Sequence, residues 1–236
     1  MRSSGLRALV LATFAVAACA VVGLGYTESD LLAIVNGEIV PEVSIAAGAN
    51  LVDYFFDNYT QEELLVEATS GLTPGIKVAA AEALKRYRIF VNPYEDLIAA
   101  YTADELKAMG ATSLPAAQAY YYMIRGDVTL ESLEADAAGI GYLAQAAGEL
   151  LGGYYSPGSF NPLTLDEAID LTENGATPGL RLAGGVALAT YILLGESDYG
   201  ADMSDEDLIT GALAATGFDL GLARVYQTLL TQRFAQ

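Results

Sequence analysis

The chain contains no histidine and no tryptophan, and its single cysteine is Cys19. Histidine titrates nearest neutral pH and is the commonest protein ligand for metals such as zinc and copper. Cysteine thiolates bind zinc and iron–sulfur clusters and act as nucleophiles. The sequence therefore predicts no cofactor and no metal site, and beyond Cys19 it excludes imidazole and thiol catalysis.

Positive charge is also scarce. The 236 residues include 30 Asp and Glu but only 11 Lys and Arg, for a formal net charge of −19. Arg2 and Arg7 both precede the first acidic residue, Glu28. A surface this acidic repels phosphate backbones and anionic lipid headgroups, so nucleic acid is not an expected partner.

The common catalytic signatures are missing as well. The chain has no glycine-rich phosphate loop with a lysine, no nucleophile elbow and no Ser-x-x-Lys motif. A pair of carboxylates that lie far apart in the sequence is the chemistry that this search leaves open. We predict a non-catalytic protein with no catalytic residues, and we keep a carboxylate-based hydrolase acting outside the cytoplasm as the alternative.

Residues 1–25 have the composition of a targeting segment. Arg2 and Arg7 give a positive start, and residues 8–18 form an apolar stretch of small and medium side chains. This order is typical of signal peptides. We therefore expect an exported protein of the periplasm or cell envelope, with residues 26–236 as a single domain.

The segment Val16-Ala17-Ala18-Cys19 resembles the lipobox of bacterial lipoproteins. It departs from the commonest form at Val16, where leucine is usual, and apolar residues 20–24 follow it in place of a polar tether. The resemblance implies that Cys19 is lipidated and becomes the new N-terminus, so that this end associates with the membrane.

Two other interpretations of the leader stay open. Ala18-Cys19-Ala20 has the small-x-small form of ordinary signal cleavage, which would release a secreted protein. Residues 8–25 are also long enough to remain as a short membrane anchor.

After the leader, two segments of the chain repeat each other. Residues 60–64, Thr-Gln-Glu-Glu-Leu, are followed fourteen residues after Thr60 by Pro-Gly-Ile-Lys-Val-Ala. Residues 164–168, Thr-Leu-Asp-Glu-Ala, are followed at the same spacing by Pro-Gly-Leu-Arg-Leu-Ala. Internal similarity of this kind is the signature of a repeat architecture.

The start of the unit recurs six times. A hydroxyl residue begins each copy, at Thr27, Thr60, Thr102, Thr129, Thr164 and Ser204. Three positions later stand Asp30, Glu63, Glu105, Ser132, Glu167 and Asp207. This spacing is typical of a capping box at a helix N-terminus. Apolar residues one position before and four positions after the cap complete it as a hydrophobic staple.

The second half of the unit is expected to be a longer helix that begins at or near a proline. The prolines are Pro41, Pro74, Pro115 and Pro178. Apolar stripes at helical spacing follow three of them. The stripes are Val43, Ala46, Ala47 and Tyr54; Ile76, Ala79, Ala80, Ala83 and Tyr87; and Leu180, Ala183, Ala187 and Tyr191.

The expected fold is therefore all-α, with about six helix-turn-helix repeats that start near residues 27, 60, 102, 129, 164 and 204. Helix pairs of this length resemble HEAT-like repeats across residues 26–236. The resemblance implies an α-solenoid, in which successive pairs stack side by side. A closed multi-helix bundle is the alternative.

Tyrosine is the most abundant aromatic residue, with fifteen copies. Three consecutive helical residues point about 100° apart, so Tyr120, Tyr121 and Tyr122 cannot all face one core. Together with Tyr154 and Tyr155 they are the predicted contacts for a partner. We expect an interaction or scaffold protein that binds a protein or another envelope component, and a homo-oligomerising envelope structural protein is a further alternative.

The interpretations of the leader differ in the mature N-terminus that they predict. If Cys19 is lipidated, the intact mass begins at Cys19 and carries acyl groups, and the protein fractionates with membranes. Cys19→Ser should then lose both properties. A wild-type mass that begins after Cys19 without acyl addition, in a protein that stays out of the membrane fraction, contradicts lipidation.

Overall fold

The computed structural model describes residues 25–37, 40–215 and 219–235, and this part of the chain contains fourteen α-helices and no strand. The all-α prediction is confirmed. None of these helices combines the length and the apolar character needed to cross a membrane. Cys19 and the rest of residues 1–24 lie outside the described residues. The helices are α2 (Glu28–Gly37), α3 (Pro41–Ala49), α4 (Val52–Asn58), α5 (Gln61–Ser70), α6 (Pro74–Arg86), α7 (Glu95–Ala100), α8 (Ala103–Gly110), α9 (Leu114–Ile124), α10 (Leu130–Ala137), α11 (Gly141–Tyr155), α12 (Leu165–Asn174), α13 (Pro178–Leu193), α14 (Asp205–Ala214) and α15 (Leu220–Phe234).

The predicted helix starts are confirmed. At Thr164, the backbone N–H donates to Glu167 Oε2 at 2.8 Å, and the Glu167 N–H donates to Thr164 Oγ1 at 3.3 Å. Reciprocal bonds of this kind also cap α5, α8, α10 and α14, and Thr27 makes the same pair of bonds with Asp30. Each box satisfies backbone donors that the helix itself leaves unpaired.

The hydrophobic staples are confirmed in five units and wrong in one. The apolar residues four positions after the caps are buried in every unit: Leu31, Leu64, Leu106, Leu133, Ala168 and Leu208. Their partners before the cap pack against the core except Tyr101, which is 40% exposed. The short helix α7, which has no buried residue, ends directly before Tyr101.

The second helices begin at prolines as expected, but two tyrosines were misplaced. Pro41, Pro74 and Pro178 are the first residues of α3, α6 and α13. Tyr87 was predicted on the buried stripe of α6, yet that helix ends at Arg86, and the Tyr87 side chain is 40% exposed with its ring against Phe56. Tyr54 belongs to a separate helix, α4, because α3 ends at Ala49.

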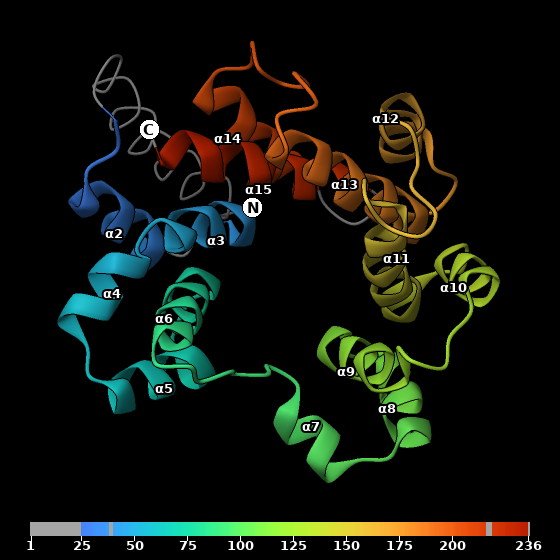
Figure 1. Ribbon diagram of the computed structural model, residues 1–236, viewed down its shortest axis with the longest axis horizontal. Coiled ribbons are helices and arrows are strands. Elements are labelled where there is room, and N and C mark those ends of the chain that lie inside the picture. Colours follow the sequence, from blue (N-terminus) through green and yellow to red (C-terminus); the bar gives the residue numbers. More distant parts are fainter. Residues whose placement is uncertain (1–24, 38–39, 216–218, 236) are drawn as a thin grey trace, which may run out of the picture.

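Six pairs of helices are arranged in a ring (Figure 1). Each pair consists of a first helix on the outside and a second helix on the inside. We call α2, α5, α8, α10, α12 and α14 the outer helices, and α3, α6, α9, α11, α13 and α15 the inner helices. Each outer helix packs on its own inner helix, and most inner helices pack on the next one around the ring.

Neighbouring inner helices meet at glycines. A Cβ atom on Gly75, the second residue of α6, would overlap the carbonyl of Ser44 in α3, and one on Gly48 would overlap Gly75. Gly148 and Gly179 form the same contact between α11 and α13, and Gly185 meets Gly221 between α13 and α15. The Gly75 N–H also donates to Ser44 Oγ at 3.1 Å. Backbones this close leave no room for any side chain.

The first and last pairs also contact each other. The Tyr26 ring lies edge-on to Phe234, with centroids 4.5 Å apart, and the Tyr26 hydroxyl donates to Asp205 at 3.2 Å. The Asn50 amide donates to the Thr231 carbonyl at 3.0 Å. Inner helices α15 and α3 therefore pack together although they lie at opposite ends of the described chain.

At one point in the ring, two successive inner helices are not packed extensively on each other. Inner helices α6 and α9 are not among the extensively packed helix pairs of the described chain. Residues 87–102, with the short helix α7, connect α6 to the outer helix α8, which precedes α9 in the chain (Figure 1). The stacked pairs are compatible with the predicted α-solenoid. The contact between the first and last pairs is equally a property of the closed bundle.

Capping should contribute measurably to stability. Thr164→Ala removes the acceptor for the Glu167 N–H and should lower the free energy of unfolding by about 1 kcal/mol at pH 7. The Thr164 backbone N–H and hydroxyl both donate to Glu167 Oε2 and hold the pKa of that carboxyl below its usual 4.5. The variant also removes the hydroxyl bond, and its share of the stability is present above about pH 4.5 and is lost as the pH falls through the lowered pKa. Urea denaturation at pH 7 and pH 3 should show a smaller difference at pH 3, and equal midpoints at pH 7 would contradict a stabilising cap.

The glycine contacts should be intolerant of a single methyl group. Gly75→Ala should destabilise the protein by about 1–3 kcal/mol or more, because the new Cβ atom meets backbone rather than a side chain that could move. Gly153→Ala is the matched control, since this helical glycine is exposed with no other atom within 4 Å of an added Cβ. The control should stabilise α11 by roughly 0.5–1 kcal/mol. Equal thermal midpoints for the two variants would show that the ring tolerates wider helix spacing.

Candidate functional site

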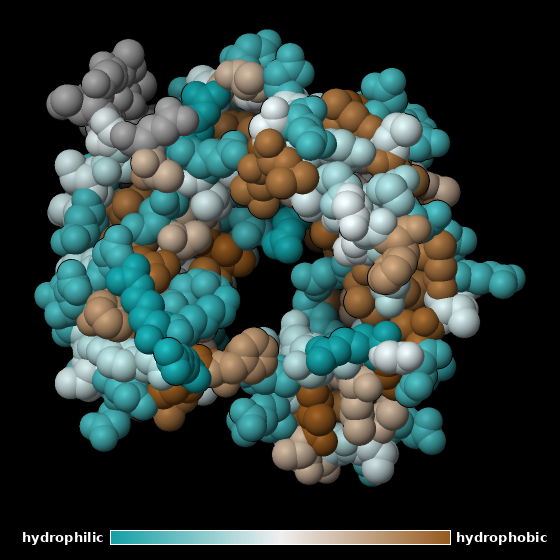
Figure 2. All heavy atoms as spheres, in the orientation of Figure 1, coloured by the Kyte–Doolittle hydropathy of each residue, from teal (hydrophilic) through white to brown (hydrophobic). Residues whose placement is uncertain are grey.

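A hollow of about 140 Å³ lies between the inner helices. It is lined from α3, α9, α11, α13 and α15, so no single repeat creates it. Figure 2 shows the ring open at its centre, with hydrophilic side chains on both sides of the opening. We call this space the central hollow. Its polar lining residues are Glu42, Gln118, Gln145, Glu149, Arg224 and Gln227, and its apolar ones are Leu114, Leu182, Leu220 and Ala223.

The polar residues of α9 and α11 form one connected side of the central hollow. Gln145 and Glu149 are four residues apart, so they lie on the same face of α11. The Gln118 amide donates from α9 to Glu149 Oε2 at 2.9 Å. This bond orients the Glu149 carboxylate and ties two inner helices together.

Helix α3 adds a carboxylate to the central hollow, and helix α15 adds a guanidinium group. Glu42 lies in the first turn of α3, and burial raises its pKa above the usual 4.5, although a bond from its own backbone N–H opposes this effect. Arg224 lies on α15, and its Nη1 donates to Gln227 Oε1 at 3.4 Å. One cation and two carboxylates therefore line the same partly buried space.

Two aromatic rings lie close to this site. Burial and the negative charge of Glu149 raise the pKa of Tyr94 to about 12, so its hydroxyl stays protonated at neutral pH. The Tyr94 ring lies 6.0 Å from that of Tyr122, and the Arg125 guanidinium stacks over Tyr122 at 3.8 Å. Tyr94 belongs to the connection between α6 and α9, which brings that connection near the hollow.

The five predicted contact tyrosines are in different environments. Tyr121 and Tyr155 are buried, and their hydroxyls donate to Asp136 and Glu134, each at 2.7 Å. Burial and these hydrogen bonds raise the pKa of both side chains. Tyr120, Tyr122 and Tyr154 are half-buried, which confirms that the trio of residues 120–122 does not share one buried face.

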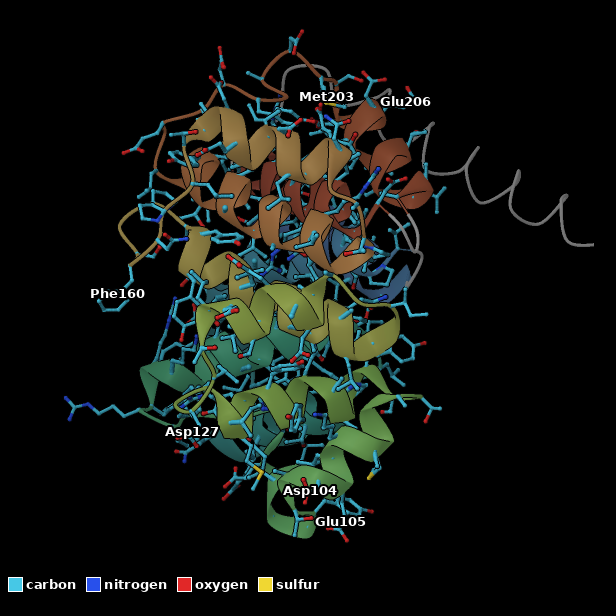
Figure 3. All side chains as sticks on the ribbon, turned by 90° about the vertical axis from the view of Figure 1, so that its right-hand side faces the viewer. Asp104, Glu105, Asp127, Phe160, Met203 and Glu206 are labelled. Atoms are coloured by element: carbon cyan, nitrogen blue, oxygen red, sulfur yellow. The ribbon has the colours of Figure 1, made fainter. Side chains whose placement is uncertain are left out.

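Exposed apolar side chains do not converge on the central hollow. Phe160 is 98% exposed and projects from the loop between α11 and α12 (Figure 3). Leu72 and Ile140 are each 89% exposed, and they lie two residues before the start of α6 and one residue before the start of α11, respectively. The alternative of a homo-oligomerising envelope protein stays a prediction.

Sequence reasoning missed all six polar residues of the hollow. A usable signal was present, since Gln118 is the one polar side chain of α9 apart from its tyrosines, and Gln145 and Glu149 are the only ones of α11. Isolated polar residues on otherwise apolar helices point to a wet or shared face. The arrangement of the inner helices in the ring decides which of these polar residues meet, and the sequence alone does not show that arrangement.

Comparisons of the chain with protein families, with curated proteins and with solved structures gave no match. The arguments for function therefore depend on the geometry and chemistry of the chain itself.

Proposed function

We propose that this chain is an exported, non-catalytic binding protein of the cell envelope, which holds its partner on the inner face of the ring. The observation that carries the proposal is the convergence of six polar side chains from four inner helices on one hollow. Concave sites with a few convergent polar groups are the usual form of a binding site. The partner is a protein or another envelope component, in keeping with an acidic chain that repels nucleic acid.

The composition of the hollow favours binding over catalysis. Three of its six polar residues are glutamines, whose amides donate and accept hydrogen bonds but do not exchange protons near neutral pH. One of the two carboxylates, Glu149, already accepts a hydrogen bond from Gln118. Amides and carboxylates of this kind hold a ligand in one orientation through directed hydrogen bonds. Tyr94 and Tyr122 add aromatic surface next to them.

A carboxylate-based hydrolase is the second candidate, and it has one specific observation in its favour. Glu42 and Glu149 line the same hollow, and burial raises the pKa of Glu42. A carboxyl group with a raised pKa next to a second carboxylate is the arrangement of a general acid and its partner. Hydrolysis of glycoside or ester substrates that is lost in both Glu42→Gln and Glu149→Gln would favour this candidate.

The proposal predicts that partner retention depends on the hollow. The immobilised protein, applied to a solubilised envelope extract, should retain a component that the double variant Glu149→Gln, Arg224→Gln releases. The matched control Lys107→Gln, Glu196→Gln changes the same charges at exposed positions outside the hollow and should retain the component. Equal retention by all three proteins would contradict a site on the inner face.

A further inference from the structure

The charged groups of the central hollow do not neutralise one another. Among the described residues, the ion pairs are Lys85–Glu82, Arg86–Asp53, Arg181–Asp219 and Arg233–Asp205. Arg224 is in none of them, and its one hydrogen bond to another side chain is the long bond to Gln227 at 3.4 Å. Its guanidinium therefore has most of its five donors available.

The carboxylates are similarly available. The Glu42 side chain makes no hydrogen bond to another residue in the described ranges, and burial disfavours its charge. Glu149 accepts one bond, from Gln118, which leaves the remaining lone pairs of its carboxylate. Both side chains lie beyond ion-pair distance of Arg224, although all three line one hollow.

Opposite charges that share a partly buried space without pairing are complementary to a ligand that carries charges of both signs. Removing charged groups from water costs free energy unless a partner compensates. A carboxylate on the ligand matches the planar fork of Arg224, which binds carboxylates in a bidentate manner. An ammonium group matches Glu42 and Glu149. Because the hollow holds two acidic groups and one basic group, a ligand with an extra positive charge fits best.

The volume sets the size of this ligand. A cavity of about 150 Å³ holds a molecule the size of benzene, and the central hollow measures about 140 Å³. The two head groups of an amino acid and the first carbons of its side chain occupy a space of this order. Leu114, Leu182 and Leu220 provide apolar surface for the aliphatic part.

We infer that the central hollow binds a small solute of the amino-acid type, with its carboxylate on Arg224 and its ammonium group at Glu42 and Glu149. This inference rests on the proposed binding function of the same site and names the chemistry of what it holds. The free solute and the same group at the end of a larger partner share this chemistry.

Isothermal titration calorimetry of the mature protein with four probes tests the inference. L-Lysine and L-norleucine carry both head groups, hexanoate carries only the carboxylate, and 1-aminopentane carries only the amine. The two amino acids should bind, lysine more tightly, and each single-group probe should bind roughly tenfold or more weakly, since a hydrogen bond to a charged group contributes about this factor.

The variants separate the two halves of the site. Arg224→Gln should abolish the preference for norleucine over 1-aminopentane, whereas Glu42→Gln and Glu149→Gln should abolish the preference for norleucine over hexanoate. Lys107→Gln and Glu196→Gln should bind like the wild type, and thermal melting should verify that every variant is folded.

Two results would overturn the inference. One is equal binding of norleucine and either single-group probe by the folded wild type. The other is no heat from any of the four probes. If partner retention from the envelope extract still depends on the hollow in that second case, the proposed function stands and only the assignment of the ligand fails.

Discussion

Glycine-to-glycine contact between inner helices is the constraint on which the rest of the structure depends. At Gly48 and Gly75, and again at Gly148 and Gly179, two backbones approach so closely that no Cβ atom fits between them. The adjoining faces are filled by alanine, for example Ala79 and Ala83, both fully buried. Helices with such narrow faces pack at short distance, so the steps from α3 to α6 and from α11 to α13 are short.

This close spacing also decides where long side chains are able to lie. At the glycine contacts, the faces between neighbouring inner helices leave no room for a side chain, and the opposite faces are covered by the outer helices with their buried leucines. The remaining direction is the centre of the ring. Gln118, Gln145 and Glu149 line the central hollow there, and Gln118 and Glu149 are hydrogen-bonded to each other. The close packing of the inner helices and the polar lining of the hollow therefore both follow from where small and long side chains lie on these helices.

Local features of this fold were predictable from the sequence, and long-range ones were not. Thr164 and Glu167 announce a helix start because a capping box involves only residues three positions apart. The position of Gly75 after Pro74 was visible, but its contact with Gly48 depends on how two helices cross. Tyr87 was misplaced because the end of α6 has no strong stop signal. Glu42 and Arg224 come from the first and last inner helices, and only the closure of the ring brings them to one hollow.

The order of packing around the ring differs from the order of the chain. Where α15 meets α3, the neighbouring units pack together without a peptide link between them; where α6 is followed by α9, the chain is continuous but the helices are not extensively packed. If the pairs are ordered by their packing, the stack begins with α8 and α9, continues through α14 and α15 to α2 and α3, and ends with α5 and α6. This order is a circular permutation of the order in the sequence. A polypeptide that joined the Phe234 end to the Tyr26 end and began instead near Asn92 would keep every major helix interface. In the natural order, the interface between the first and last units joins residues from opposite ends of the described chain, so it cannot form until both ends are present.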